Sequence, residues 1–255
     1  MNQIKGPLLF RLFCRAVWLF SPKYHIEGRE NLPDEPCVIV GNHSQMYGPI
    51  AAELWVPGEP YTWCTAEMMD RKQVPDYAYQ DFWSGKPRSV RWFFRLLSYA
   101  IAPLAQYIFT HARTIAVHRD AHVIGTFRDS VARLQEGRNL VIFPEHYTPY
   151  NNVVHEFQDR FIDVARMYRR SAGRDLVFVP LYVAPRLKTL FFGAPVVFHP
   201  DAPLADERQR ICRELMNEIT RMAAAQPEHT VVPYPNVPRR QYPKNIPVED
   251  LTHEA

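Results

Sequence analysis

Residues 37–48 read CVIVGNHSQMYG, and this stretch decides the fold that we expect. Its first half is a short apolar run rich in β-branched side chains, which is typical of a buried strand. Its second half places His43 just after the point where that strand ends. In a parallel sheet the loops that follow the strands converge on one edge, where ligands usually bind. The sequence therefore predicts a functional histidine at the carboxyl edge of a parallel sheet.

Further apolar runs of the same kind alternate with amphipathic stretches. The additional strands are expected at 114–117, 140–143 and 176–179. Apolar side chains recur at helical spacing from 123 to 134 and from 157 to 168, and a glycine of the kind that ends helices follows each stretch. A last helix is expected over 206–225. This alternation predicts an α/β fold with a largely parallel central sheet flanked by helices.

The composition favours one domain and excludes several classes of protein. The chain has 255 residues, 47% of them apolar, which is enough for one large core. It carries 30 basic and 27 acidic residues, so its net charge of +3 is too small for a general nucleic-acid binder. The four cysteines lie far apart without a CxxC pair, which predicts reduced thiols rather than disulfides or a zinc site.

The first twenty residues, MNQIKGPLLFRLFCRAVWLF, predict an amphipathic helix rather than a signal peptide. Arg11 and Arg15 interrupt the apolar runs and no cleavage site follows, so export is not expected. Such a helix can lie in the interface of a bilayer or pack on its own domain, and the pattern fits both. The apolar side chains that fall largely on one stripe are Leu8, Leu9, Leu12, Phe13, Val17, Leu19 and Phe20.

A second apolar stretch, 92–109, is about as long as a short membrane span. It contains Arg95, Pro103 and Gln106, so spanning is not expected. The proline predicts a break or kink near Ala102 and hence two shorter helices. The long polar segment 70–91 before it is interpreted as a lid or a family-specific cap over the site.

Polar side chains follow the predicted strands. His118, Arg119 and Asp120 come after the second strand, and Glu145 comes directly after the third. His43, Arg119 and Glu145 are therefore predicted to cluster at one edge of the sheet.

Four blocks in this order resemble the lysophosphatidate and glycerol-3-phosphate acyltransferase family over residues 24–200. Residues 26–33 and the strand into Asn42-His43 resemble the approach to the NHxxxxD motif. Residues 114–119 resemble the second block, which ends in an arginine. Residues 140–145 resemble the first half of the FPEGTR block, and Val179-Pro180 resembles the short fourth block. The resemblance implies a glycerol-3-phosphate acyltransferase-like fold.

The sequence departs from the family pattern in two places. Gly48 stands where the family has the motif aspartate, and residues 146–148 read His-Tyr-Thr where the family has Gly-Thr-Arg. An aspartate would fix the histidine tautomer and stabilise the imidazolium. We expect Glu67, Asp70, Glu145 or a backbone carbonyl to take over this task.

The resemblance also implies the activity and the roles of individual residues. A fatty acyl group would pass from acyl-CoA or acyl-carrier protein to a hydroxyl of a lysophospholipid or related precursor such as 1-acylglycerol-3-phosphate. His43 would be the general base and Glu145 the second catalytic residue. Arg119 would bind the acceptor's phosphate. The predicted substrate-binding residues are Asn42, Ser44, Gly48, Arg119, Pro144, His146 and Tyr147.

Structural roles explain some of the same residues. His43 could cap a loop, Arg119 could pair with Asp120, and Glu145 could hold its own loop. His146 and His155 lack further ligands for a metal site. A set of aromatic residues would line an acyl groove, meet the membrane interface or pack in the core. These residues are Trp63, Tyr77, Tyr79, Phe82, Trp83 and Trp92.

These observations divide the chain into three parts. Residues 1–23 form a membrane-interface helix, 24–226 an acyltransferase domain and 227–255 a proline-rich tail with little regular structure. The expected partners are the lipid substrate, the cytoplasmic face of a membrane, to which the protein binds peripherally, and acyl-carrier protein. No nucleic acid, metal or bound cofactor is expected. The alternatives are a pseudoenzyme that binds acyl chains or acyl-carrier protein without turnover, and a membrane-binding module without acyl chemistry.

Overall fold

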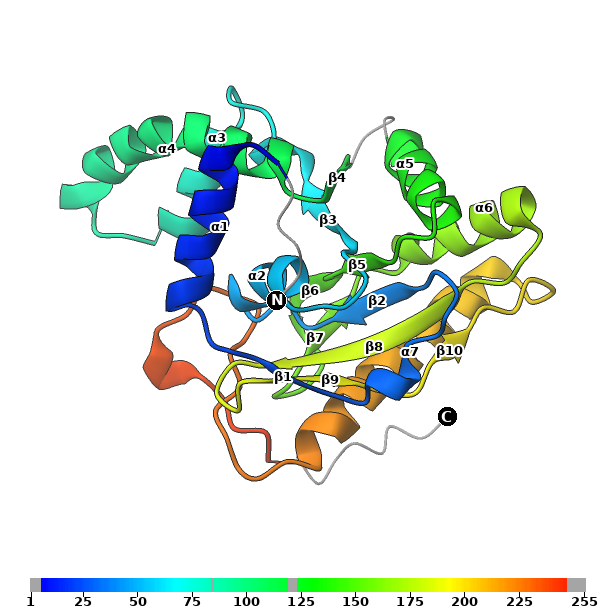
Figure 1. Cartoon of the computed structure of the whole chain (residues 1–255). Helices are drawn as coiled ribbons and strands as arrows, with labels where there is room; N and C mark the ends of the chain where they lie inside the picture. Colours follow the sequence, from blue (N-terminus) through cyan, green and yellow to red (C-terminus); the bar gives the residue numbers. More distant parts are fainter. Residues whose placement is uncertain (1–5, 84, 119–122, 247–255) are drawn as a thin grey trace.

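A mixed β-sheet organises the protein (Figure 1). The computed structural model describes residues 6–83, 85–118 and 123–246, and eight strands within them form this sheet. Along the sheet the strands follow the order β1-β9-β8-β2-β5-β3-β4, and β10 pairs with β8. The strands are β1 (His25–Glu27), β2 (Val38–Gly41), β3 (Tyr61–Thr65), β4 (Thr114–Val117), β5 (Leu140–Ile142), β8 (Val177–Ala184), β9 (Thr189–Phe192) and β10 (Val196–Val197).

The central strands are parallel, as the sequence predicts. β2 pairs in parallel with both β8 and β5, and β3 pairs in parallel with both β5 and β4. The antiparallel pairs are those of β8 with β9 and with β10. All four predicted strands are present, whereas β1, β3, β9 and β10 were not predicted. The carboxyl ends of β2 and β5 therefore lie side by side.

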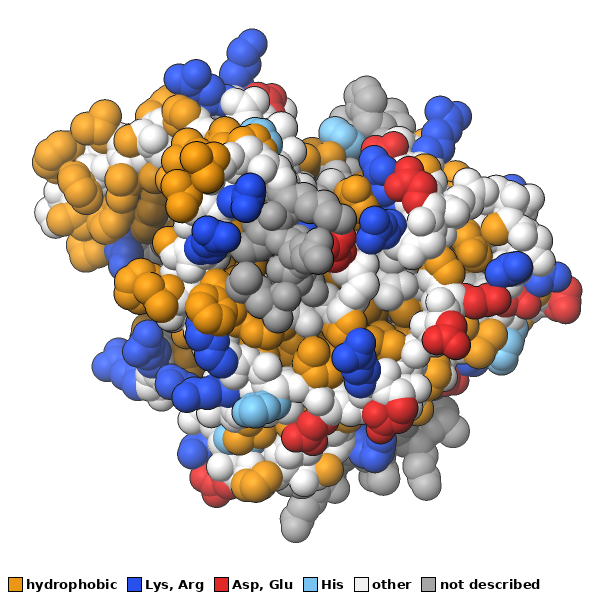
Figure 2. Space-filling view, in the orientation of Figure 1, with side chains coloured by type: hydrophobic (Ala, Val, Ile, Leu, Met, Phe, Trp, Pro, Cys, Tyr) orange, Lys and Arg blue, Asp and Glu red, His pale blue; other side chains and the backbone are white. Residues whose placement is uncertain are grey.

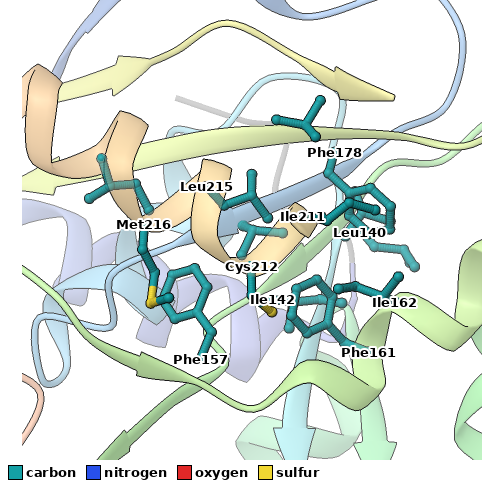
Figure 3. Close-up of a cluster of buried hydrophobic side chains, with 14 of the residues drawn as sticks. Leu140, Ile142, Phe157, Phe161, Ile162, Phe178, Ile211, Cys212, Leu215 and Met216 are labelled. Carbon is teal, nitrogen blue, oxygen red and sulfur yellow. The ribbon is translucent and has the colours of Figure 1, made fainter. Parts of the chain in front are cut away.

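Helices cover both faces of this sheet. Val38 and Val40 of β2 point to one face, which α5 (Val123–Gln135), α6 (Asp163–Ala172) and α7 (Leu204–Ala224) cover. Ile39 points to the other face, which α1 (Leu8–Phe20) and α2 (Tyr47–Leu54) cover. A strand buried on both faces reads as a continuous apolar run, which explains residues 37–40. Figure 3 shows the first face, where Ile211 and Leu215 of α7 lie close to Leu140 of β5.

Glycines end two of the predicted helices. Gly137, with φ of +78°, follows α5, and Gly173, with φ of +70°, caps α6. Both residues adopt the left-handed conformation that favours glycine at a helix end. The predicted ends of these two helices are therefore confirmed.

A hairpin between β5 and α6 was not predicted. Its strands, β6 (Glu145–Pro149) and β7 (His155–Phe157), pair in antiparallel fashion. The predicted helical start at Phe157 is therefore wrong: a 3₁₀ turn, η5 (Asp159–Ile162), precedes α6. The expected stripe is nevertheless buried in one cluster, because a strand end, a 3₁₀ turn and a helix all contribute side chains to the same face.

The prediction of two short helices around Pro103 is also wrong. A single helix, α4 (Arg91–His111), runs through the proline. Proline removes the hydrogen bond to the carbonyl of Tyr99. Packing against α3 (Val74–Ala78) holds the helix on both sides of the proline. The buried residues of this contact are Ala102 and Ala105 of α4 and Val74 and Ala78 of α3.

Short helical turns build the segment predicted as a lid. After η2 (Ala66–Met68) come α3, a π-helical turn η3 (Tyr79–Trp83) and η4 (Arg88–Val90), which pack against α4. Further 3₁₀ turns are η1 (Arg29–Asn31) and, in the C-terminal segment, η6 (Arg239–Gln241). The lid function of this segment stays a prediction.

The N-terminal helix α1 packs on the domain with only part of its surface. Phe10 and Cys14 are buried against the sheet face that α2 also covers. The opposite side leaves five large apolar side chains exposed, and its role at a membrane interface stays a prediction. These side chains are Leu8, Leu9, Leu12, Leu19 and Phe20. Within the described ranges, no helix has both the length and the hydropathy to cross a bilayer.

Candidate active site

His43 and Glu145 come together at the carboxyl ends of neighbouring strands. His43 follows β2 by two residues, and Glu145 is the first residue of β6, just after β5. Oε2 of Glu145 accepts the backbone N–H of His43 at 2.5 Å. Oε1 accepts the backbone N–H of His155 in β7 at 2.9 Å. The glutamate thus joins the loop after β2 to the β6–β7 hairpin.

The surroundings of Glu145 shift its pKa in two opposite directions. Only 2% of its surface is exposed, and this burial raises the pKa of Glu145 to about 7, while the two backbone N–H groups act in the opposite direction. Both carboxylate oxygens face N–H donors, and these hydrogen bonds favour the ionised form against the effect of burial. Glu145 therefore fixes the backbone that carries His43 and does not contact the imidazole as a hydrogen-bond partner.

The imidazole of His43 lies edge-on to two aromatic rings. Its centroid is 5.4 Å from Phe143, at an interplanar angle of 63°, and 5.6 Å from Tyr234, at 73°. Nδ1 is buried and has no hydrogen-bond partner among the described residues. His43 as a whole residue is partly exposed.

Burial also determines the protonation of this ring. It lowers the pKa of His43 to about 4, and backbone groups of Gln45 and of His43 itself offset only part of this effect. Neither backbone group forms a hydrogen bond of acceptable geometry with Nδ1. The imidazole is therefore neutral near pH 7, which is the form that can accept a proton, while the same burial makes it a weaker base.

None of the three carboxylates suggested by the sequence hydrogen-bonds this ring. Glu145 binds backbone N–H groups, and Asp70 accepts a hydrogen bond from the backbone N–H of Lys72 and another from Gln73, each at 2.9 Å. Glu67 accepts a hydrogen bond from Thr65. The expected replacement for the motif aspartate is thus not found among the described residues.

The tight turn after His43 explains why residue 48 is glycine. Ser44 and Gln45 both have positive φ, +46° and +53°, and the backbone N–H of Gly48 then donates to the carbonyl of His43 at 3.1 Å. A Cβ at position 48 would lie 2.5 Å from that carbonyl oxygen and 3.0 Å from the ring of Phe143. A side chain such as aspartate therefore does not fit this turn.

Asn42 and Ser44 tie the same loop to β8. Asn42 accepts the backbone N–H of Val183 at 2.7 Å and donates to the Val183 carbonyl at 3.1 Å and to Ser44 at 2.8 Å. Each is only 1% exposed. Their polar atoms are thus engaged within the protein, and their substrate-binding role stays a prediction.

The other predicted substrate-binding residues have different surroundings. Pro144 is buried, and its carbonyl accepts the N–H of Gln158 at 2.9 Å. His146 and Tyr147 are exposed on β6, and the Tyr147 ring lies 5.4 Å from Tyr234. Arg119 lies outside the described residues. Their roles in substrate binding stay predictions.

The predicted aromatic set is divided between the core and the surface. Trp63 donates to Ser130 at 2.9 Å and packs beside Phe127, so it belongs to the core. Trp92 is 70% exposed at the start of α4. Core packing and surface exposure therefore both occur within this set.

Gln45, His155 and Tyr234 adjoin the site, although the sequence did not indicate them. His155 was considered only as a metal ligand, yet its Nδ1 lies 3.8 Å from Oε1 of Glu145. Gln45 lies inside the motif but at a position without a chemical signature. Tyr234 lies in the proline-rich tail, and no local pattern relates that tail to His43.

The largely parallel sheet flanked by helices places the protein in the α/β class. A histidine and a glutamate lie at the carboxyl ends of two adjacent strands of this sheet. One solved structure that matches is the crystal structure of the 1-acyl-sn-glycerophosphate (LPA) acyltransferase PlsC from Thermotoga maritima. The TM-score is 0.50 and the identity 16%, over 86% of this chain and 80% of that chain. No family model and no curated protein matches the sequence. The chain thus has the fold of a glycerophospholipid acyltransferase.

Proposed function

We propose that this chain is an acyltransferase that moves a fatty acyl group from acyl-CoA or acyl-carrier protein to a hydroxyl of a lysophospholipid or related lipid precursor. The observation that carries the proposal is the placement of His43. It follows the central strand β2, and the Glu145 carboxylate fixes its backbone. A neutral imidazole in this position is suited to general-base catalysis.

The proposed step needs no group other than the two substrates and His43. The hydroxyl oxygen of the acceptor attacks the thioester carbonyl carbon while its proton passes to Nε2 of His43. The carbon–sulfur bond then breaks, and the imidazolium returns the proton to the leaving thiolate. In its ionised form, the buried carboxylate of Glu145 would place negative charge next to the His43 backbone and favour the transient cation.

The exposed apolar side chains support the proposal that the protein binds the surface of a membrane. Figure 2 shows such side chains gathered over α4, with basic side chains nearby. Apolar groups beside Lys and Arg are suited to an anionic lipid interface. The exposed apolar residues of α4 are Trp92, Phe93, Leu96, Tyr99 and Leu104.

A second candidate function is binding without turnover. It is favoured by one observation, the missing acceptor on Nδ1 of His43. Loss of the equivalent aspartate costs about 10⁴-fold in a serine-protease triad. A protein of this fold could then retain acyl chains or acyl-carrier protein and release no product.

A thiol-release assay distinguishes these functions. The purified protein is given acyl-CoA or acyl-carrier protein with a panel of acceptors: lysophosphatidate, lysophospholipids with other headgroups, and monoacylglycerol. We expect acceptor-dependent thiol release that falls at least about 100-fold in His43→Ala. His25→Ala, which removes an exposed histidine on β1, is the matched control and should leave the rate unchanged. Tight binding of acyl-carrier protein without release from either donor would refute the enzyme proposal in favour of the second candidate.

A further inference from the structure

The C-terminal segment forms a loop whose two ends meet. Thr230 and Lys244 pair in an isolated antiparallel bridge, and the N–H of Val231 donates to the carbonyl of Pro243 at 3.0 Å. We call residues 231–243 the C-terminal loop. Compact loops closed at the neck in this way behave as units, because their ends are fixed independently of their tips.

Buried hydrogen bonds fix the neck of this loop to α7 and β8. Asn245 accepts the N–H of His229 and donates to the carbonyl of Ala223, both at 2.7 Å. His229 also hydrogen-bonds the hydroxyl of Tyr182 at 2.7 Å through Nε2. The neck therefore stays in place even if the tip of the loop is released.

The C-terminal loop is docked on the turn that carries His43. Both the NH₂ group and the carbonyl oxygen of the Gln45 side chain form hydrogen bonds with this loop. It donates to the carbonyl of Pro235 and accepts from the hydroxyl of Tyr242, each at 3.1 Å. Ser44 and Gln45 have positive φ, which is unfavourable for residues other than glycine unless surrounding contacts support it. The loop supplies such contacts.

Tyr234 brings the loop into contact with the candidate site. Its ring lies 5.6 Å from His43, 5.4 Å from Tyr147 and 6.1 Å from His155, so it touches residues from three other segments. Burial raises the pKa of Tyr234 to about 12, so the phenol is neutral. Phe143 covers the imidazole from a second direction.

We propose that Tyr234 is a positioning residue for His43, and that the C-terminal loop, docked through Gln45, takes over the orienting task that a carboxylate would otherwise perform. An imidazole without a hydrogen bond on Nδ1 has no polar restraint on its side-chain torsions. Edge-on packing between Phe143 and Tyr234 restrains those torsions and keeps water from Nδ1. This role deepens the proposed function and rests on it, because the orientation of the His43 ring matters for catalysis only if His43 is the general base.

The proposal is tested on the full chain with three substitutions and a control. Tyr234→Phe keeps the ring, whereas Tyr234→Ala removes it. Gln45→Asn tolerates the positive φ but shortens the amide that holds the loop. Asn236→Ala is the matched control, because Asn236 is exposed on the same loop and forms no hydrogen bond with a described residue. Circular dichroism checks that each variant is folded.

Two measurements are made, and one of them needs no substrate. The first is an NMR titration of His43, with His43→Gln identifying its signal among the ten histidines. Tyr234→Ala should raise the pKa of His43 from about 4 toward 6.5 by admitting water. Gln45→Asn should raise it by less. Tyr234→Phe and Asn236→Ala should leave it unchanged. The neighbouring titratable groups, Glu145, Tyr147 and His155, are the same in all these variants.

The second measurement is steady-state thiol release. Tyr234→Ala should lower kcat by about 10- to 100-fold with little change in KM, and Tyr234→Phe should restore it. An unchanged pKa of His43 in Tyr234→Ala, or faster thiol release because the loop blocks the site, would overturn the proposal. If no variant and no wild-type protein releases thiol, the proposed function fails, and the titration still decides whether Tyr234 shields His43.

Discussion

The substitution Gly48→Ala should destabilise the protein, although the same exchange usually stabilises a helix. Gly48 lies in the first turn of α2, where replacing glycine by alanine is normally worth about 0.5–1 kcal/mol. Here the new Cβ would lie 2.5 Å from the carbonyl oxygen of His43 and 3.0 Å from the ring of Phe143. The closest atom belongs to the backbone and cannot rotate away. Overpacking of this kind costs about 1–3 kcal/mol.

Thermal and urea unfolding of Gly48→Ala and Gly48→Asp, with thiol release, measure this effect. Each kcal/mol lost should lower Tm by about 2–4 °C in a protein of this size. Gly125→Ala in α5 is the matched control: a Cβ there meets nothing within 4 Å, so this variant should gain stability. Gly48→Asp should lose stability and not raise the rate. The steric explanation is refuted if Gly48→Ala is as stable as the wild type or if Gly48→Asp is the faster enzyme.

Three further predictions follow from the contacts of the same loop. Glu145→Gln places an NH₂ group against one of two backbone N–H donors. Urea unfolding should therefore show a free energy of unfolding that is lower by about 1–3 kcal/mol. A variant as stable as the wild type would contradict the carboxylate assignment. The pKa of His43 is lowered in the folded state. As pH falls, the unfolded chain therefore binds the proton before the folded chain does, and the free energy of unfolding decreases between about pH 6.5 and about pH 4. The wild type should therefore lose up to about 3 kcal/mol relative to His43→Gln across that range, and a constant difference would show that the ring is not buried as described. Asn42→Ala removes the bonds to both backbone groups of Val183 and should cost about 1–3 kcal/mol, whereas an unchanged urea midpoint would mean that the loop is held by other contacts.

The sequence by itself determined the central strands and the position of the candidate site. Residues 37–40 and 140–142 are apolar because strands in the middle of a parallel sheet are buried on both faces. His43 and Glu145 follow those strands directly in the chain. Since parallel strands bring their carboxyl ends to one edge, short-range pattern and sheet geometry together sufficed to place the two residues near one another.

Only the tertiary structure decided how these residues are held. Glu145 accepts hydrogen bonds from the backbone of His43 and not from its ring, and this depends on the path of the β6–β7 hairpin. Tyr234 lies beside His43 because Asn245 fixes the neck of the C-terminal loop and Gln45 holds Pro235 within it, although this loop is almost 200 residues from His43 in the sequence. The helix α4 continues through Pro103 because α3 packs across it. Each of these outcomes is set by contacts between distant segments, which local periodicity and propensity do not encode.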